Sequence, residues 1–215
     1  MTDARRTYLP AAGHDWGLPL YDPLVKLLGG DAARRVLVEQ AALQPGDRIL
    51  EVGCGTGSLL MQIARTRPSV DITGLDPDPK AVARAKRKAD AASVAIRLDR
   101  GFADALPYAD ASFDRVFSCF MFHHLTDADE KVRALREIRR VLKPGGRLQL
   151  VDFAHDESRK TRGPVRWVHR HHHLADNTDA RVMSFISEAG LVEPVLLRRA
   201  TMFFVMGLAY YQASR

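Results

Sequence analysis

The sequence predicts an α/β fold built around a mostly parallel sheet, and two observations carry that prediction. Apolar runs of strand length alternate with helical runs from Pro45 onward, which is the pattern of βαβ units. The first strand-to-helix turn carries three alternating glycines, Gly53, Gly55 and Gly57. Right-handed crossovers place helices on both faces of such a sheet, so we expect a Rossmann-like three-layer αβα sandwich. Ligands of these sheets bind beyond the carboxyl ends of the strands.

The composition is that of a globular domain. The chain has 215 residues, 46% hydrophobic and 27% charged, which excludes a disordered chain. Its two cysteines cannot build a disulfide framework, which favours a reducing compartment. No apolar run approaches the roughly 20 residues that cross a membrane. We therefore expect a cytoplasmic protein without a membrane span. The net charge of +6 permits an anionic partner without identifying one.

The first part of the chain differs from the rest. Residues 18–43 have helical apolar spacing, and Gly29-Gly30 divides them into two short helices, with Asp31 as the expected N-cap of the second. The residues before them are polar and show no periodicity. We expect residues 1–44 to form an N-terminal arm and helices that act as a lid, and residues 45–215 to form the ligand-binding domain.

The remaining elements follow from the same patterns. Strands are predicted at 48–52, 70–75, 94–98, 113–118, 147–153, 192–197 and 201–205. Helices are predicted at 58–66, from 78 to about 90, from near 126 to 142, and at 179–189. Asp78 and Pro79 provide the start signal of the second of these helices. Thr126-Asp127-Ala128-Asp129 resembles a capping box before the third, and Pro144-Gly145-Gly146 are expected to end it.

The glycine turn indicates a ligand that approaches the backbone closely. A nicotinamide fingerprint has the spacing G-x-G-x-x-G, whereas here Gly57 comes one residue early and Ser58 takes the place of the third glycine. Asp76 ends the second strand about 20 residues further on, where an acid binds ribose hydroxyls. The alternatives are a plain tight turn, and an Asp76 that only caps the turn before Pro77.

Five segments resemble the successive motifs of a known family. They read ILEVGCGTG (49–57), GLDPDP (74–79), ALPYADASFDRVFS (105–118), FHHL (122–125) and LKPGGRLQLVDF (142–153). In order and spacing they are similar to class I S-adenosylmethionine-dependent methyltransferases, in particular the small-molecule group that includes the ubiquinone and menaquinone C-methyltransferases. The resemblance implies a seven-stranded sheet whose last strand is antiparallel. It also implies that residues 45–215 bind S-adenosyl-L-methionine.

The resemblance also assigns cofactor contacts around the glycine turn. Gly53, Gly55 and Gly57 would pass under the methionine part of the cofactor, and Glu51 would hold that turn. Asp76 would bind the ribose hydroxyls.

Further contacts are implied at the adenine and along the cavity. Pro77 would flank the adenine, and Ala103 would offer its backbone amide to the ring. The family usually has Asp or Asn before that alanine, whereas this chain has Phe102, so Asp104 becomes a weaker candidate for the adenine amino group. Cys54 and Cys119 are expected as small residues beside the cofactor, and the Cys119 carbonyl would face its amino group.

Three side chains are candidates for catalysis. Methyl transfer from a sulfonium needs mainly correct positioning, and it needs a base only where the acceptor must lose a proton. His123 and His124 follow the fourth strand, and imidazole titrates near neutral pH. Packing or capping at the next helix is the alternative for both. Tyr21 is the third candidate, because a tyrosine here closes over the cofactor in related enzymes; a half-buried packing tyrosine is the alternative.

Residues 155–178 form the most individual segment, and we expect them to cover the acceptor site. They are rich in Arg, Lys and His, and cations of this kind recognise carboxylates or phosphates. His169 and His173 have a spacing that can hold a metal on a helix, although no ligand set is complete, so no metal is expected. A solvated basic face is the simplest alternative.

The sequence therefore predicts an S-adenosylmethionine-dependent methyltransferase that acts on a carbon, oxygen or nitrogen atom of a small molecule, with an anionic acceptor among the candidates. Two alternatives stay open. The acceptor is RNA or protein, although we find no RNA-binding module and expect no nucleic acid partner. Alternatively, the chain binds the cofactor without catalysis. A monomer and a homodimer are both compatible with the sequence.

Overall fold

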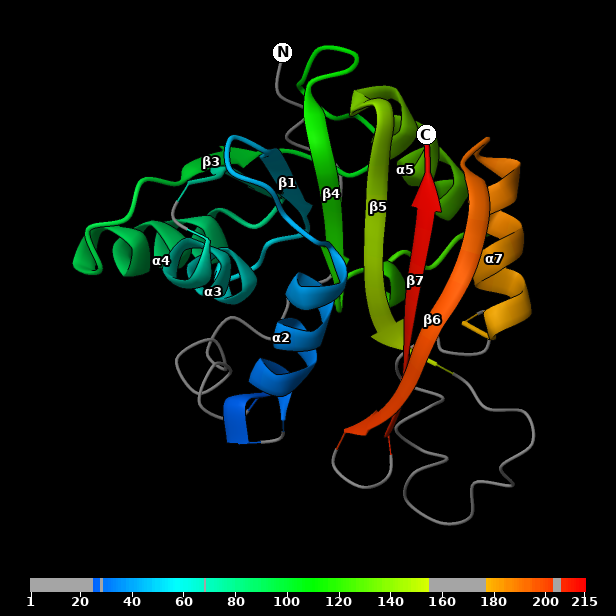
Figure 1. Cartoon of the computed structure of the whole chain (residues 1–215), viewed down its shortest axis with the longest axis horizontal. Helices are drawn as coiled ribbons and strands as arrows, with labels where there is room; N and C mark the ends of the chain where they lie inside the picture. Colours follow the sequence, from blue (N-terminus) through cyan, green and yellow to red (C-terminus); the bar gives the residue numbers. More distant parts are fainter. Residues whose placement is uncertain (1–24, 28, 68, 155–176, 203–205) are drawn as a thin grey trace.

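The computed structural model describes residues 25–27, 29–67, 69–154, 177–202 and 206–215. These residues form one seven-stranded sheet flanked by helices (Figure 1). The strands are β1 (Arg48–Val52), β2 (Asp71–Asp76), β3 (Arg97–Arg100), β4 (Phe113–Cys119), β5 (Leu142–Phe153), β6 (Val192–Met202) and β7 (Met206–Ser214). The helices are α2 (Gly30–Gln40), α3 (Ser58–Thr66), α4 (Pro79–Ala91), α5 (Ala128–Val141), α7 (Asp179–Glu188) and the 3₁₀ turn η2 (Phe122–His124).

The sheet has the order β3-β2-β1-β4-β5-β7-β6. Strands β1 to β5 pair in parallel, and β7 runs antiparallel to both β5 and β6. The predicted fold class is thereby confirmed. Because the chain leaves β1 toward β2 on one side and returns to β4 on the other, the strand order reverses between β1 and β4. A crevice opens at such a reversal, outside the carboxyl ends of the strands.

Alternating side chains of the central strands build two apolar layers, one on each face of the sheet. Leu50, Val116 and Leu150 contribute to the core covered by α5 and α7. Ile49 and Phe117 contribute to the core covered by α2 and α3. Burial of both faces explains why these strands read as nearly continuous apolar runs. Among the described residues no helix has the length and apolar character needed to cross a membrane.

Several boundaries agree with the sequence patterns. Helix α3 spans the predicted residues, and α4 begins as expected, with Asp78 accepting a hydrogen bond from the Lys80 amide at 2.8 Å and Pro79 in the first position. Helix α2, in contrast, begins after Gly29, whose φ of +93° is accessible to glycine, so the prediction that Asp31 is the N-cap is wrong. Asp31 lies in the first turn and pairs with Arg34 at 3.1 Å.

Two strands are displaced from their predicted positions. Strand β3 begins at Arg97 instead of residue 94, because the Val94 amide still donates to the Ala89 carbonyl at the end of α4. The strand predicted at 192–197 is confirmed, but it continues to Met202, so the separate last strand predicted at 201–205 is wrong. The described residues of both predicted strands belong to the single long strand β6, and the last strand follows as β7. Tyr210 and Tyr211 of β7 are both buried, because this strand lies inside the sheet.

Helix α5 also has different ends. It begins at Ala128, with Asp127 as N-cap in place of Thr126, and it ends at Val141. Pro144-Gly145-Gly146 do not end the helix; they lie within β5, which starts at Leu142. The pairing of β4 with β5 shifts between Phe113 and Arg115, so the extra residues form a bulge at the start of β5.

Arg140 of α5 ties the loop after β3 to the helix layer. Its guanidinium donates to Glu137 Oε1 at 2.7 Å and to the carbonyls of Tyr108 and Leu106 at 2.7 and 3.0 Å. We expect Arg140→Ala to lower the free energy of unfolding by about 1.5–3 kcal/mol, because it removes hydrogen bonds from a charged donor and leaves loop carbonyls unpaired. Urea denaturation measures the change.

Arg136 is the matched control for this prediction. It lies one turn earlier on α5, is half exposed and pairs with Glu188 only at 3.9 Å. An exposed pair of this kind contributes about 0–1 kcal/mol. Equal losses in Arg136→Ala and Arg140→Ala would contradict the role given to Arg140.

Candidate active site

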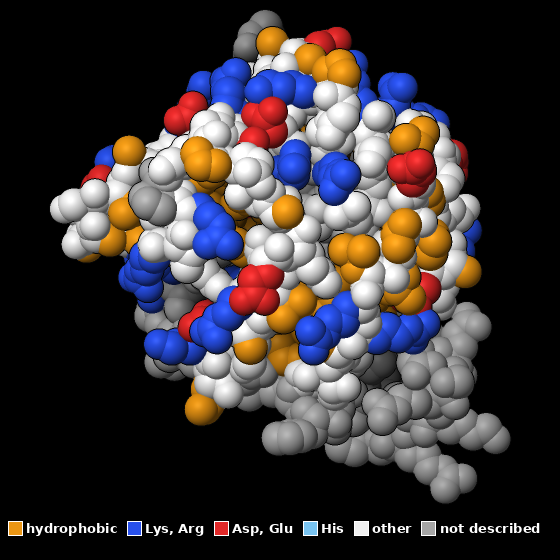
Figure 2. All heavy atoms as spheres, in the orientation of Figure 1, with side chains coloured by type: hydrophobic (Ala, Val, Ile, Leu, Met, Phe, Trp, Pro, Cys, Tyr) orange, Lys and Arg blue, Asp and Glu red, His pale blue; other side chains and the backbone are white. Residues whose placement is uncertain are grey.

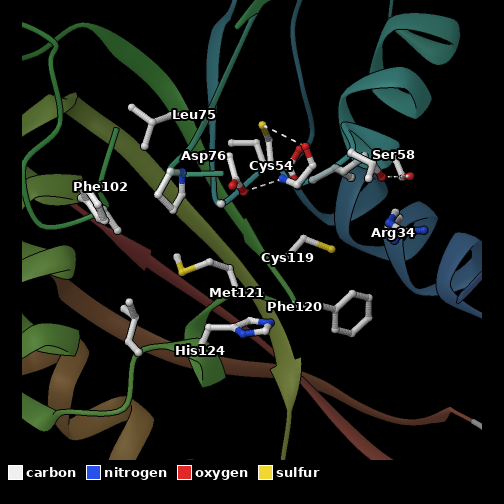
Figure 3. A pocket seen from close by; sticks show the side chains of 18 of the residues that line it. Arg34, Cys54, Ser58, Leu75, Asp76, Phe102, Cys119, Phe120, Met121 and His124 are labelled. Carbon is white, nitrogen blue, oxygen red and sulfur yellow. Dashed lines mark hydrogen bonds between the residues drawn. The ribbon is translucent and has the colours of Figure 1, made fainter. Parts of the chain in front are cut away.

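A cavity of about 440 Å³ lies at the carboxyl ends of β1, β2 and β4, in the crevice that the strand order predicts. Figure 3 shows its two ends, with Phe102 at one and Arg34 and Ser58 at the other. Asp76, Cys54 and Cys119 lie between these two ends. Phe120 and His124 lie across the cavity from Asp76 and Cys54. The volume is within the range of small-molecule and cofactor sites.

The glycine turn forms the floor of the cavity. Gly53, Gly55 and Gly57 have φ values of +73°, +52° and +74°, which side-chain-bearing residues rarely adopt. A Cβ on Gly53 would lie 2.1 Å from Met121 Cγ. The amides of Gly53 and Cys54 both donate to the Leu75 carbonyl, at 2.8 and 3.0 Å. Glycine is therefore required here both for the turn and for the close approach of Met121, which follows β4.

Asp76 holds this turn from the end of β2. Its Oδ2 accepts a hydrogen bond from the Gly55 amide at 2.8 Å, and its Oδ1 accepts one from the Asp78 amide at 2.9 Å. The side chain is buried and lines the cavity. Burial raises the pKa of this carboxyl, although the two amides oppose the shift. Capping the turn and facing a ligand are thus compatible roles for this residue.

Glu51 brings an unusual carboxyl group to the cavity. Its side chain is 3% exposed, and Oε2 has no hydrogen-bond partner among the described residues. Burial raises the pKa of Glu51 well above its ordinary value, and the nearby charges of Arg34 and Lys88 only partly oppose this. A buried carboxyl oxygen that faces a cavity and lacks a partner indicates a ligand with a donor or a positive charge.

The opposite end of the cavity is apolar. Pro77, Phe102 and Ala103 line it. The adenine contacts expected for Pro77 and Ala103 stay a prediction. The cavity lining does not include Gly57, whose Cβ position is 2.9 Å from Ala85 of α4. It does not include Asp104 either, whose carboxylate lies 3.6 Å from Arg133.

The two adjacent histidines have different surroundings. His124 lines the cavity (Figure 3), whereas His123 is 6% exposed and its Nδ1 lies 2.6 Å from Asp152 Oδ1 of β5. Tyr21, the third catalytic candidate, lies outside the described residues, as do residues 1–24 of the expected lid and residues 155–176 of the expected cover. Within the first 44 residues, α2 packs its buried Leu37 and Val38 into the core with α3.

Phe120 forms part of the cavity wall in a strained conformation. Its φ is +55°, in the left-handed region that is rare for bulky residues. Its ring stacks on Phe153 of β5, with the ring centroids 5.3 Å apart. Of the two rings only Phe120 is among the described residues that line the cavity, so the cavity has one aromatic ring in its wall just after β4. The apolar pattern of β4 gave no sign of this conformation.

Two cations near the cavity were not identified from the sequence. Arg34 of α2 is 6% exposed and lines the cavity. Lys88 of α4 donates to Thr56 Oγ1 at 3.3 Å and to Ser58 Oγ at 3.1 Å, next to the glycine turn. Both belong to helices whose other basic residues face solvent, so only the three-dimensional arrangement distinguishes them.

The described part of the chain holds no candidate metal site. Among the described residues no group of three or more His, Cys, Asp or Glu side chains could hold a metal ion. His169 and His173, the pair with metal-binding spacing, lie outside that part of the chain.

Part of the chain is similar to known methyltransferases. Residues 49–146 match the family model described as "Methyltransferase domain". Demethylmenaquinone methyltransferase of Deinococcus radiodurans is 39% identical over 138 residues, 63% of this chain and 56% of that protein. The 27-O-demethylrifamycin SV methyltransferase of Amycolatopsis mediterranei is 43% identical over 113 residues, 52% of this chain and 40% of that protein. The chain thus spans about half the length of these relatives.

Solved structures agree on the fold. The YcgJ protein of Bacillus subtilis superposes with a TM-score of 0.71 at 20% identity, over 86% of this chain and 98% of that one. Phosphoethanolamine N-methyltransferase 2 of Haemonchus contortus, in complex with S-adenosyl-L-methionine, gives a TM-score of 0.80 at 15% identity, over 95% of this chain and 58% of that one. Residues 49–146 therefore match a methyltransferase domain, and the solved structures share the fold over most of the chain.

Proposed function

We propose that this chain transfers a methyl group from S-adenosylmethionine to a small-molecule acceptor. The observation that carries the proposal is the cavity itself, which has an apolar slot at one end and the side chains of Glu51 and Arg34 at the other. The cofactor has the same distribution of chemistry, with a flat adenine at one end and an ammonium, a carboxylate and a sulfonium at the other.

The residues present fit this cofactor. The unpartnered Oε2 of Glu51 would accept from the ammonium group, and the Arg34 guanidinium would pair with the carboxylate. Asp76 would accept from the ribose hydroxyls, as its predicted role requires. Ala103 and Phe102 would lie along the adenine, and the Gly53 backbone would pass beneath the methionine part. The bound cofactor supplies an activated methyl group on a positively charged sulfur.

The acceptor we propose is a small, flat molecule with an ionisable hydroxyl group on or next to a ring. The stacked pair of Phe120 and Phe153 at the cavity side supports a flat acceptor, because aromatic faces favour such partners. The relatives named as demethylmenaquinone and 27-O-demethylrifamycin methyltransferases support the same class. His124 lines the cavity next to this wall and would accept the hydroxyl proton.

The surface gives little support to a nucleic acid acceptor. Figure 2 shows Lys and Arg side chains scattered among Asp and Glu over the visible face. A basic groove with interleaved aromatic side chains would be expected for a single-stranded acceptor. A cofactor-binding module without catalysis stays the second candidate, because every contact inferred for the cofactor would serve that role equally well.

Calorimetric titration with S-adenosylmethionine, S-adenosylhomocysteine and NAD in parallel tests the cofactor. We expect micromolar binding of the first two and none of NAD. Incubation with S-adenosylmethionine and a panel of quinols, phenols and other hydroxyl-bearing ring compounds, read by mass spectrometry for a gain of one methyl group, then tests catalysis. Binding without any methylated product would favour the non-catalytic module, and NAD binding alone would exclude the proposal.

A further inference from the structure

Asp152 is a buried carboxylate whose hydrogen bonds converge on one neighbouring residue. It ends β5 on the side of the cavity, and its side chain is 2% exposed. Oδ1 lies 2.6 Å from the ring Nδ1 of His123, and Oδ2 accepts from the His123 backbone amide at 3.0 Å. Oδ1 also accepts from the Phe153 amide at 2.6 Å. Asp152 therefore fixes both the ring and the peptide of His123.

The interaction is strong because the carboxyl group is ionised. Burial alone would raise the pKa of Asp152, but the charge and hydrogen bond of His123, together with the two backbone amides, outweigh burial and lower the pKa. Charge-assisted hydrogen bonds are about twice as strong as neutral ones. Such an anchor costs desolvation, so its presence requires a structural or a functional reason.

The anchored residue adjoins the histidine that lines the cavity. The rings of His123 and His124 lie with their centroids 4.2 Å apart, and Phe153 packs against His123 from the other side at 5.1 Å. His124 ends the 3₁₀ turn η2, where its amide donates to the Met121 carbonyl at 2.8 Å. One turn of 3₁₀ helix has little stability of its own, so the position of His124 depends on what anchors the turn.

We propose that Asp152 and His123 are positioning residues that hold His124 against the acceptor, where His124 accepts the acceptor's hydroxyl proton. This inference rests on the proposed function. The O–H bond breaks with its electron pair left on the acceptor oxygen, and the proton passes to a ring nitrogen of His124 and later to solvent. The negative charge on the acceptor makes its oxygen, or a ring carbon conjugated to it, the nucleophile.

The central test is Asp152→Asn alone and in a His124→Ala background. Asparagine keeps the shape but cannot accept hydrogen bonds from both the ring and the backbone amides. We expect kcat to fall about 10- to 100-fold, the range for a catalytic group displaced by about 1 Å. The affinity for S-adenosylhomocysteine should stay unchanged. In the His124→Ala background the same substitution should cost no further kcat, because residues that act through one another are not additive.

Three further variants keep the test sharp. His123→Asn, whose amide can replace the Nδ1 donor, should retain most of the activity, whereas His123→Ala should not. Asp114→Asn is the matched control, because this carboxylate lies near the start of β4 and bonds Lys143 and the Arg48 amide instead. We expect it to leave kcat unchanged. Equal losses from Asp152→Asn with and without His124, or full activity in Asp152→Asn, would overturn the proposal.

Imidazole ¹⁵N NMR of the S-adenosylhomocysteine-bound protein supplies a readout that needs no turnover. If Asp152 positions His124, Asp152→Asn should shift the ring signals of both histidines. A shift confined to His123 would overturn the positioning role even if no acceptor is methylated, whereas absent turnover with both signals shifted would count only against the proposed function. Melting temperatures of all variants identify any that fail to fold, and His123→Ala, compared with His123→Asn, then replaces Asp152→Asn as the decisive variant.

Discussion

Gly53→Ala should abolish measurable cofactor binding. The new methyl group would lie 2.1 Å from Met121 Cγ and 2.7 Å from Met121 Cβ, so β4 and the glycine turn could not keep their present separation. Alanine would also have to adopt a φ of +73°. We expect binding of S-adenosylhomocysteine to weaken at least about 100-fold, because the backbone under the ligand must move. Destabilisation by roughly 2–4 kcal/mol should accompany it, from left-handed strain together with overpacking.

Gly145→Ala separates the two causes. Gly145 has a φ of +76°, close to that of Gly53, but nothing lies within 4 Å of its Cβ position, and it belongs to the bulge at the start of β5. It should lose only the roughly 1 kcal/mol that a left-handed alanine costs and should bind the cofactor normally. Calorimetric titration and urea denaturation of both variants measure the difference. Normal binding by Gly53→Ala would contradict the role of the turn as the cavity floor.

Glu51→Gln should have the second-largest effect, and it should change binding and stability in opposite directions. Burial raises the pKa of Glu51 in the ligand-free protein, whereas a bound ammonium group favours the ionised carboxylate. Binding should therefore release a proton, and affinity should rise with pH until the raised pKa is passed. In the variant, affinity at pH 8 should fall by about 1.5–3 kcal/mol, or roughly 10- to 150-fold, the range for hydrogen bonds to charged groups.

The same substitution should raise the stability of the ligand-free protein, although it lowers its affinity for the cofactor. A carboxyl group with a folded pKa above its unfolded value contributes stability below the unfolded pKa and loses it as the pH rises through the folded pKa. At pH 8 the wild type therefore carries this cost and Glu51→Gln does not, so the variant should melt at a higher temperature. Titration in two buffers of different ionisation enthalpy counts the released protons. Any proton release that remains on binding to Glu51→Gln should come from Asp76, whose pKa is also raised.

Glu188→Gln is the control for Glu51. This glutamate ends α7, and its side chain is 58% exposed. Its neutralisation should alter neither cofactor affinity nor the proton count. If wild-type binding released no proton at any pH between 5 and 8, the ammonium contact inferred for Glu51 would be wrong.

Local signals explain which parts of the fold could be predicted from the sequence. Helix α3 and the start of α4 were predicted because glycines, Asp78 and Pro79 mark their boundaries chemically. The order of β6 and β7 could not be predicted in the same way. The sequence from Ala200 to Tyr211 is nearly continuously apolar across the junction of these two strands, so no alternation marks where one ends.

Some residues of the site could likewise be predicted from the sequence, and others could not. The glycine turn and Asp76 follow strands directly, so their place at the carboxyl edge follows from topology. His123 and His124 are equivalent in the sequence, yet a single 3₁₀ turn directs one ring toward Asp152 and the other to the cavity. Arg34 comes from a helix before the first strand, and only the packing of α2 on α3 brings it to the site. Contacts of this kind depend on tertiary structure that periodicity does not encode.

Only some of the described segments line the cavity, which bears on how the acceptor could be exchanged. Apart from Arg34, the described residues that line it all lie between Glu51 and Glu130, so the proposed cofactor contacts, together with Phe120 and His124, are encoded by one short stretch of chain. Strands β6 and β7 and helix α7 complete the sheet and its cover without lining that cavity. Substitutions on the surface of these elements can therefore accumulate without altering the residues that line the cavity. A chimera that keeps residues 30–154 and takes its remaining segments from a relative should retain the donor and change the acceptor.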